Sequence, residues 1–131
     1  MLESNSISHP RSAVTNNLTS AQFATDRLAA FGRGDVGAIL DQYADDAIVV
    51  TAAGVLRGKA QIRAMIEGIV GEFAQPGVQF ELASQQAIDH VVMFTWSART
   101  GANVYDLGAE TYVLENGRAV VQTFAAKVTP R

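Results

Sequence analysis

Residues 104–128 read VYDLGAETYVLENGRAVVQTFAAKV and have the clearest strand pattern of the chain. Apolar and polar side chains alternate along much of both halves, and a period of two residues is typical of β-strands. Between the halves stands Asn116-Gly117, whose two residues both tolerate the positive φ angles of a type I′ turn. The stretch therefore predicts a β-hairpin with strands over residues 104–114 and 119–128.

Two further strand-like segments precede this hairpin. They cover residues 78–88 and 91–99 and are separated by a two-residue turn. Farther upstream, the β-branched run at 48–51 and the short segment at 55–57 predict a smaller hairpin. Hairpin connections join neighbouring strands in opposite directions, so we expect a mostly antiparallel sheet.

Three amphipathic helices are expected in the first part of the chain. The first begins with Thr19 or Ser20 as N-cap and ends near Gly34. In the second, Asp35 is the cap, and the buried face runs from Val36 to Tyr43 at helical spacing. The third covers residues 59–73. Helices packed on an antiparallel sheet predict an α+β domain.

Length and composition limit the domain organisation and the chemistry. A chain of 131 residues with 48% hydrophobic residues suits one domain, expected over residues 19–131. The polar residues 1–18 are expected to form a flexible leader. With no cysteine, the chain has no disulfide, thiol nucleophile or cysteine-ligated metal. With only His9 and His90, a three-histidine metal site is excluded within one chain.

Charge and hydropathy argue against several partners. The net charge of -3 disfavours a dedicated nucleic-acid binder. No apolar run approaches the roughly 20 residues of a membrane-spanning helix, and none resembles a signal peptide. We therefore expect a cytoplasmic protein without nucleic-acid or membrane partners. The adjacent Asp45 and Asp46 are interpreted as solvated residues of a connection, so no metal site is predicted.

The order of these elements resembles the SnoaL-like branch of the nuclear transport factor 2-like superfamily, which includes ketosteroid isomerases and polyketide cyclases. The resemblance covers residues 19–128 and is carried by short motifs that build the scaffold. These motifs are Gly34-Asp35, Tyr43-Ala44-Asp45-Asp46-Ala47, Arg57-Gly58-Lys59-Ala60-Gln61-Ile62 and Asn116-Gly117. The resemblance implies a cystatin-like cone with an apolar pocket open at one end, and homodimers that pair through the outer face of the sheet.

The catalytic residues of ketosteroid isomerases are largely replaced in this sequence. The family's general-base aspartate corresponds to Thr51, and its tyrosine donor falls near Arg27. Its second aspartate, an oxyanion donor, falls on Glu110. Because threonine is no base at neutral pH, steroid isomerisation by the same mechanism is not expected.

Glu110 and Arg27 are the predicted catalytic residues. In an apolar pocket beside Trp96, desolvation would favour the neutral carboxyl of Glu110 and suit it to general acid or base catalysis. Arg27 lies one helical turn from Phe23 and from Phe31, so it can reach the same pocket, where it would stabilise negative charge or neutralise Glu110. The alternative is a structural role of Glu110, either in a salt bridge, for example with Arg27 or Lys127, or in a solvated position at the strand edge.

The remaining site predictions rest on alternation along the strands. Phe94, Trp96 and Ala98 are expected to face inward, whereas Asp106 is placed on the same face as Glu110 and Tyr112. The predicted ligand-binding residues are Trp96, Phe94, Tyr112, Gln122, Phe124, Thr51, Tyr43 and Asp106.

Three functions remain open at this point. The first is a cofactor-independent enzyme of isomerase, cyclase or hydrolase type that moves a proton on a small apolar or ring-containing molecule. The second is a noncatalytic ligand-binding or dimerisation module of the same fold. The third is a protein-interaction adaptor, which predicts an exposed apolar patch and a collapsed pocket.

Overall fold

The structure, a computed structural model, describes residues 10–131. Within this range the chain forms three helices and six strands, which confirms the predicted α+β class. In chain order they are α1 (Pro10–Arg33), α2 (Val36–Asp41), β1 (Tyr43–Thr51), β2 (Gly54–Arg57), α3 (Gly58–Phe73), β3 (Gln79–Ile88), β4 (Val91–Arg99), β5 (Asn103–Glu115) and β6 (Arg118–Pro130).

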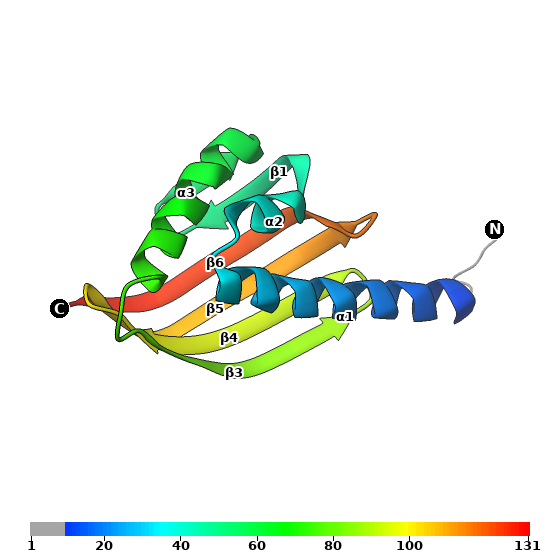
Figure 1. Ribbon diagram of the computed structural model, residues 1–131. Helices are drawn as coiled ribbons and strands as arrows, with labels where there is room; N and C mark the ends of the chain where they lie inside the picture. Colours follow the sequence, from blue (N-terminus) through cyan, green and yellow to red (C-terminus); the bar gives the residue numbers. More distant parts are fainter. Residues whose placement is uncertain (1–9) are drawn as a thin grey trace.

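The six strands form one sheet in the order β2-β1-β6-β5-β4-β3 (Figure 1). All neighbours pair antiparallel except β1 and β6, which run parallel. The last strand of the chain therefore lies inside the sheet, between the first strand and the fifth.

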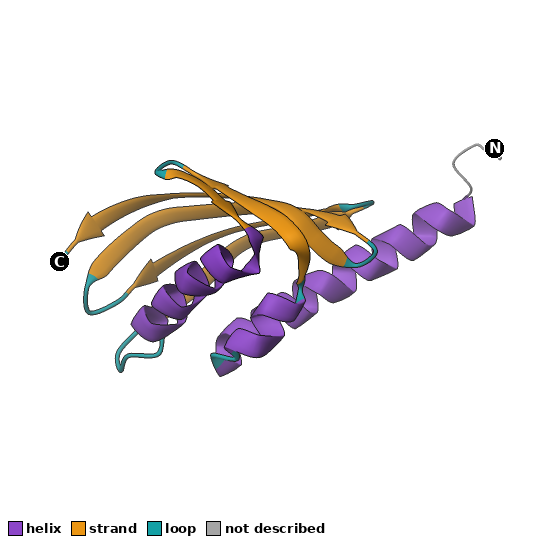
Figure 2. Ribbon diagram, turned by 90° about the horizontal axis from the view of Figure 1, so that it is seen from above, coloured by secondary structure: helices purple, strands orange, loops and turns teal. Residues whose placement is uncertain are grey.

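All three helices lie on the concave side of the curved sheet (Figure 2). The core fills the space between them and combines residues of α1, such as Phe23 and Ala24, with inward residues of the strands, such as Val92 and Tyr112. Each of these four residues is at most 4% exposed. None of the helices in the described part of the chain is long and apolar enough to cross a membrane.

Helix α1 begins at Pro10, nine residues before the predicted start, so the prediction for residues 10–18 was wrong. These residues lack apolar periodicity, which is why the sequence did not indicate a helix there. The end of this segment contacts the β3–β4 turn, where Oδ1 of Asn17 accepts a 2.6 Å hydrogen bond from the backbone N–H of Asp89. Nδ2 of Asn16 also lies 3.3 Å from the ring of His90. The rest of the predicted leader, residues 1–9, lies outside the described residues.

The second helix is shorter than predicted. Asp35 caps α2 as expected, because its side chain accepts a 3.0 Å hydrogen bond from the N–H of Ala38. The helix ends at Asp41, and Tyr43 is the first residue of β1, where it pairs with Ala119. The apolar spacing that placed Tyr43 on a helix face was misleading, since a buried strand position next to β6 suits the same side chain.

The β5–β6 turn confirms the hairpin prediction. Asn116 has φ 52° and Gly117 has φ 77°, and the flanking Glu115 and Arg118 pair directly. Gly58 adopts φ 79° where β2 passes into α3. This is the left-handed region, which favours glycine, so the residue permits the abrupt change from strand to helix.

A β-bulge interrupts β5 near its start. Tyr105 pairs with Val128 and Leu107 pairs with Lys127, so Asp106 is an extra residue without a partner on β6. Because side chains alternate between the two faces of a strand, one extra residue moves the side chains on one side of the bulge to the opposite face. Tyr105 consequently shares the inner face with Glu110, and Asp106 is exposed.

Candidate functional site

A cavity of about 440 Å³ lies between the helices and the inner face of the sheet. Helix α1 and helix α3 form one wall, and strands β3 to β6 form the other. Most of the lining is apolar or aromatic. The lining residues are Arg27, Leu28, Phe31, Gly32, Met65, Ile66, Ile69, Phe73, Val78, Phe80, Leu82, Phe94, Trp96, Tyr105, Glu110, Tyr112, Gln122 and Phe124.

Trp96 is the largest side chain in the lining of this cavity. Its ring centroid lies 5.4 Å from that of Tyr105 and 5.7 Å from that of Phe80. Phe73 meets it edge to face at 6.0 Å. Such offset and edge contacts are favourable for aromatic pairs. The opposite residue on β5 is Gly108, and without a side chain there the indole can lie flat against the strand.

Glu110 supplies the carboxylate of the cavity. Its Oε2 accepts a 2.7 Å hydrogen bond from the indole Nε1 of Trp96. Its Oε1 accepts hydrogen bonds from the Tyr112 hydroxyl and, at 3.2 Å, from Nε2 of Gln122. An ionised carboxylate has about four acceptor positions. Three are used, so Oε2 retains one.

The Tyr112 hydroxyl connects Glu110 with Arg27. It donates to Glu110, and it accepts a 3.1 Å hydrogen bond from Nε of Arg27. Gln122 also donates to this hydroxyl, at 3.2 Å, and its Oε1 accepts from the hydroxyl of Tyr43. The carboxylate of Glu110 and the guanidinium of Arg27 therefore interact through one buried hydroxyl, that of Tyr112.

Arg27 is held by many contacts and is only 2% exposed. One Nη1 bond reaches the carbonyl of Ile39 at 3.1 Å, and Nη2 donates to the Tyr43 hydroxyl. The guanidinium carbon lies 4.8–5.0 Å from the ring centroids of Phe31, Tyr43 and Tyr112. Cation–π contacts and hydrogen bonds compensate for the desolvation of this charge.

Burial and charge shift the pKa values of this network. Burial alone lowers the pKa of Arg27, but electrostatic interactions with Tyr112, Tyr43 and Glu110 raise it overall. Burial also raises the pKa of Tyr112 well above its ordinary value, although the nearby Arg27 opposes this effect. The pKa of Tyr43 is raised for the same reason. Both phenols therefore remain protonated donors at neutral pH.

A second carboxylate, Glu72, lies at the end of α3 near the cavity. It accepts hydrogen bonds from the hydroxyl of Thr100 at 2.6 Å, from Nδ2 of Asn103 at 3.0 Å and from the hydroxyl of Tyr105 at 2.8 Å. Desolvation raises the pKa of Glu72, but these hydrogen bonds lower it overall. Burial and the bond to Glu72 raise the pKa of Tyr105 to about 12. The cluster ties α3 to the β4–β5 connection.

The structure brings most of the predicted site residues to one cavity. Both predicted catalytic residues, Glu110 and Arg27, line it. They are joined there by five of the eight predicted ligand-binding residues, which are Trp96, Phe94, Tyr112, Gln122 and Phe124.

Three predicted ligand-binding residues do not line the cavity. Asp106 faces outward because of the β5 bulge, and its carboxylate lies 3.9 Å from Lys127. The hydroxyl of Thr51 closes the β1–β2 turn, donating to the carbonyl of Gly54 at 3.0 Å. Tyr43 is 1% exposed and lies behind the lining, in the network around Arg27.

Several lining residues were not predicted as part of the site. Simple alternation places Tyr105 on the face opposite Glu110, and the bulge that brings both to the inner face leaves no mark in the sequence. Phe73 ends the apolar stripe of α3, a pattern that indicates core packing as readily as the lining of a cavity. Phe80 and Leu82 alternate with polar residues at the start of β3, and this pattern could have indicated their inward direction.

The residues of the described range offer little to a metal ion. No group of three or more His, Asp or Glu side chains is close enough there to hold one. Asp45 and Asp46 lie exposed on β1, and Asp45 is 3.6 Å from the ammonium group of Lys59.

The chain resembles known proteins along most of its length. Residues 24–124 match the family model described as SnoaL-like domain. A SnoaL-like protein of unknown function from Burkholderia thailandensis is 22% identical, with a TM-score of 0.67 and coverage of 84% of this chain and 95% of that chain. An NTF2-like protein of unknown function from Mesorhizobium loti is 16% identical, with a TM-score of 0.70 and coverage of 86% and 93%.

A further similar structure is an LEH-like epoxide hydrolase from M. tuberculosis. It is 13% identical, with a TM-score of 0.63, and the match covers 85% of this chain and 84% of that chain. At such identities the solved structures establish the fold and not the activity. The search of curated proteins found no match. The family match over residues 24–124, together with the fold, shows that the chain belongs to the SnoaL-like family of the nuclear transport factor 2-like superfamily.

Proposed function

We propose that this domain binds a small apolar molecule in the cavity and moves a proton through Glu110 without a cofactor. The observation that carries the proposal is the open acceptor position on Oε2 of Glu110 in a cavity whose lining is otherwise mostly apolar. A carboxylate in such a place can take a proton from a bound molecule, or from a water molecule beside it, and return it elsewhere. Isomerase-, cyclase- and hydrolase-type steps all require this.

Three side chains orient the carboxylate for this task. Trp96 holds Oε2, whereas Tyr112 and Gln122 hold Oε1. Donors fixed in this way keep the carboxylate in one geometry, as general-base catalysis requires. Arg27 is a positioning residue in this proposal, because it acts on Glu110 through the hydroxyl of Tyr112.

Two apolar probes test the proposal. An epoxycyclohexanol reports base-assisted opening by water, and a β,γ-unsaturated cyclohexenone that carries a hydroxyl group reports proton shift into conjugation. Binding is followed by the fluorescence of Trp96, the only tryptophan of the chain. Glu110→Gln is expected to abolish turnover of any probe that the wild type converts, with binding retained. The matched control is Glu67→Gln, on the exposed side of α3.

The noncatalytic alternative has support of its own. The hydrogen bonds between Arg27, Tyr112 and Glu110 form a closed network that could exist for stability alone. Binding of both probes without conversion by the wild type would favour a ligand-binding module. Turnover that survives in Glu110→Gln would remove Glu110 as the base. The open cavity argues against the adaptor alternative, for which a collapsed pocket was expected.

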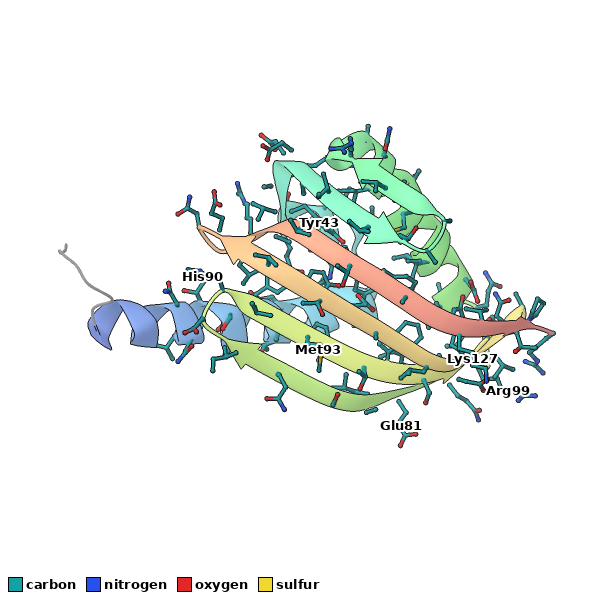
Figure 3. All side chains as sticks on the ribbon, turned by 180° about the vertical axis from the view of Figure 1, so that it is seen from behind. Tyr43, Glu81, His90, Met93, Arg99 and Lys127 are labelled. Atoms are coloured by element: carbon teal, nitrogen blue, oxygen red, sulfur yellow. The ribbon has the colours of Figure 1, made fainter. Side chains whose placement is uncertain are left out.

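The outer face of the sheet supports a proposal of homodimers. Cross-strand pairs at its centre are small and uncharged, namely Ala109 with Ala125, Thr111 with Thr123 and Val113 with Val121. Labelled charged residues, Glu81, Arg99 and Lys127, lie toward one end of this face, whereas Met93 lies near its middle (Figure 3). Depletion of charge at the centre is typical of protein interfaces.

A cytoplasmic location stays a prediction from the sequence.

A further inference from the structure

We propose that the cavity selects an apolar molecule with one neutral hydrogen-bond donor, a hydroxyl or N–H group, which binds Oε2 of Glu110. This inference rests on the proposed function, since it names the ligand class of the same cavity. It follows from an imbalance between donors and acceptors among the side chains of the lining.

The donors beside Glu110 are already used. Trp96 donates through Nε1 to Oε2 of Glu110, and Tyr112 donates its hydroxyl hydrogen to Oε1. Nε2 of Gln122 donates both to Glu110 and to the hydroxyl of Tyr112. None of these three side chains therefore has a hydrogen left for a ligand in this arrangement.

The two remaining donor side chains of the lining, Tyr105 and Arg27, use all but one of their O–H and N–H groups. The hydroxyl of Tyr105 donates to Glu72 at 2.8 Å. Arg27 donates once through Nε, twice through Nη1 and once through Nη2, which uses four of its five N–H groups. Its guanidinium is surrounded by rings, including those of Phe31 and Tyr43, and is 2% exposed.

The charged acceptor, in contrast, has room. Oε2 of Glu110 holds the Trp96 hydrogen bond and can accept another. A ligand hydroxyl or N–H group finds a charged partner there. A carbonyl or ether oxygen of a ligand would lose its hydrogen bonds to water and would face the carboxylate, which cannot donate a hydrogen bond to it. Binding of such an oxygen is therefore unfavourable.

The charge on Glu110 is balanced within the protein. The guanidinium of Arg27 is linked to the carboxylate by a single hydroxyl, that of Tyr112. A ligand cation would gain from the carboxylate but would be repelled by the nearby guanidinium. A neutral donor has no such cost, so we assign the cavity to alcohols and other neutral hydroxyl or N–H donors rather than to amines that are cations at neutral pH.

Matched ligands of one skeleton test the inference. Menthol carries a hydroxyl, menthone has the corresponding carbonyl, and menthylamine is a cation at neutral pH. Each is titrated into the full chain with Trp96 fluorescence as readout. Menthol is expected to bind about tenfold more tightly than menthone, and more tightly than menthylamine. In Glu110→Gln the preference for menthol over menthone is expected to disappear, whereas Glu67→Gln retains it.

Each outcome bears on the inference separately from the proposed function. Equal binding of menthol and menthone, or no binding of either, overturns the inference whatever the turnover of the catalytic probes. Tighter binding of menthylamine overturns the assignment to neutral donors. A menthol preference that depends on Glu110 supports the inference even where no probe is converted, and in that case only the catalytic part of the proposed function fails.

Discussion

The indole of Trp96 on β4 lies directly over Gly108 on β5, the residue with which it pairs in the sheet. A Cβ added at Gly108 would stand 2.2 Å from Cε2 of the indole and 2.3 Å from Cζ2. Non-bonded carbon atoms do not approach so closely, so the indole can occupy this position only because Gly108 has no side chain. The same placement directs Nε1 toward Glu110.

Gly108→Ala is therefore expected to displace Trp96 and break its bond to Glu110. Overpacking of this kind typically costs about 1–3 kcal/mol of unfolding free energy. Denaturant unfolding measures this loss, and the emission of the single tryptophan should move toward longer wavelength as the ring becomes more solvated. The matched control is Gly68→Ala in α3, where an added Cβ meets nothing within 4 Å. The control should be neutral or slightly stabilising; similar losses in both variants would contradict the explanation.

Tyr112→Phe removes the hydroxyl that joins Arg27 to Glu110. Nε of Arg27 then loses its partner in a fully buried place, and the carboxylate loses one donor. The expected loss of unfolding free energy is about 2–3 kcal/mol, because the groups left unpaired are charged. Tyr105→Phe is the control and should cost about 1 kcal/mol or less, since Glu72 retains its other hydrogen bonds. A smaller loss for Tyr112→Phe than for the control would argue against the network.

Alkaline titration tests the burial of the phenols. The chain has three tyrosines, and the pKa of each is raised above the ordinary value of 10.0, that of Tyr105 to about 12. The folded state holds these phenol protons more tightly than the unfolded state does. Its stability from this source is fully present below pH 10 and is lost as the pH rises from 10 toward 12. Tyrosinate absorbance of the folded protein should therefore stay low at pH 10, whereas the denatured chain titrates there. A tyrosine that ionises near pH 10 with secondary structure intact would contradict the described contacts.

The proposed homodimer is tested at the centre of the outer sheet face. Light scattering after size exclusion should give twice the chain mass for the wild type. Thr111→Arg places a charge opposite Thr123 in that face and is expected to give the mass of one chain with unchanged circular dichroism. Thr25→Arg, on the exposed side of α1, should leave the mass unchanged. A monomeric wild type at high concentration would remove the proposed interface.

Alternation along the strands predicted most of the sheet and much of the cavity. Phe94, Trp96, Gln122 and Phe124 all lie on the inner face, as a period of two residues indicates. Asp106 was misplaced because the bulge adds one residue without changing the local pattern of polar and apolar side chains. A bulge is a property of pairing between strands, so a single strand's sequence cannot reveal it.

The hydrogen-bond network was beyond prediction for a different reason. The spacing along α1 indicated that Arg27 can reach the interior, and this is where it lies. Its partner Tyr112 is 85 residues away in the chain. The prediction offered a direct pairing of Arg27 with Glu110, whereas the structure routes the contact through that phenol. Which of several neighbouring polar groups stands between two charges depends on packing at the level of single atoms.

The position of β6 inside the sheet has a consequence for biogenesis. Strand β1 pairs with β2 along one edge, and its other edge has no partner until β6 is present. Only β6 joins this pair to β5 and the rest of the sheet. Residues 118–130 leave the ribosome after β1 to β5, so the two halves of the sheet can unite only once β6 has been synthesised. Such distant pairings are slow to form. A nascent chain interrupted before β6 would lack Gln122 and would expose apolar strand edges, so unfinished copies should be substrates for chaperones and proteases.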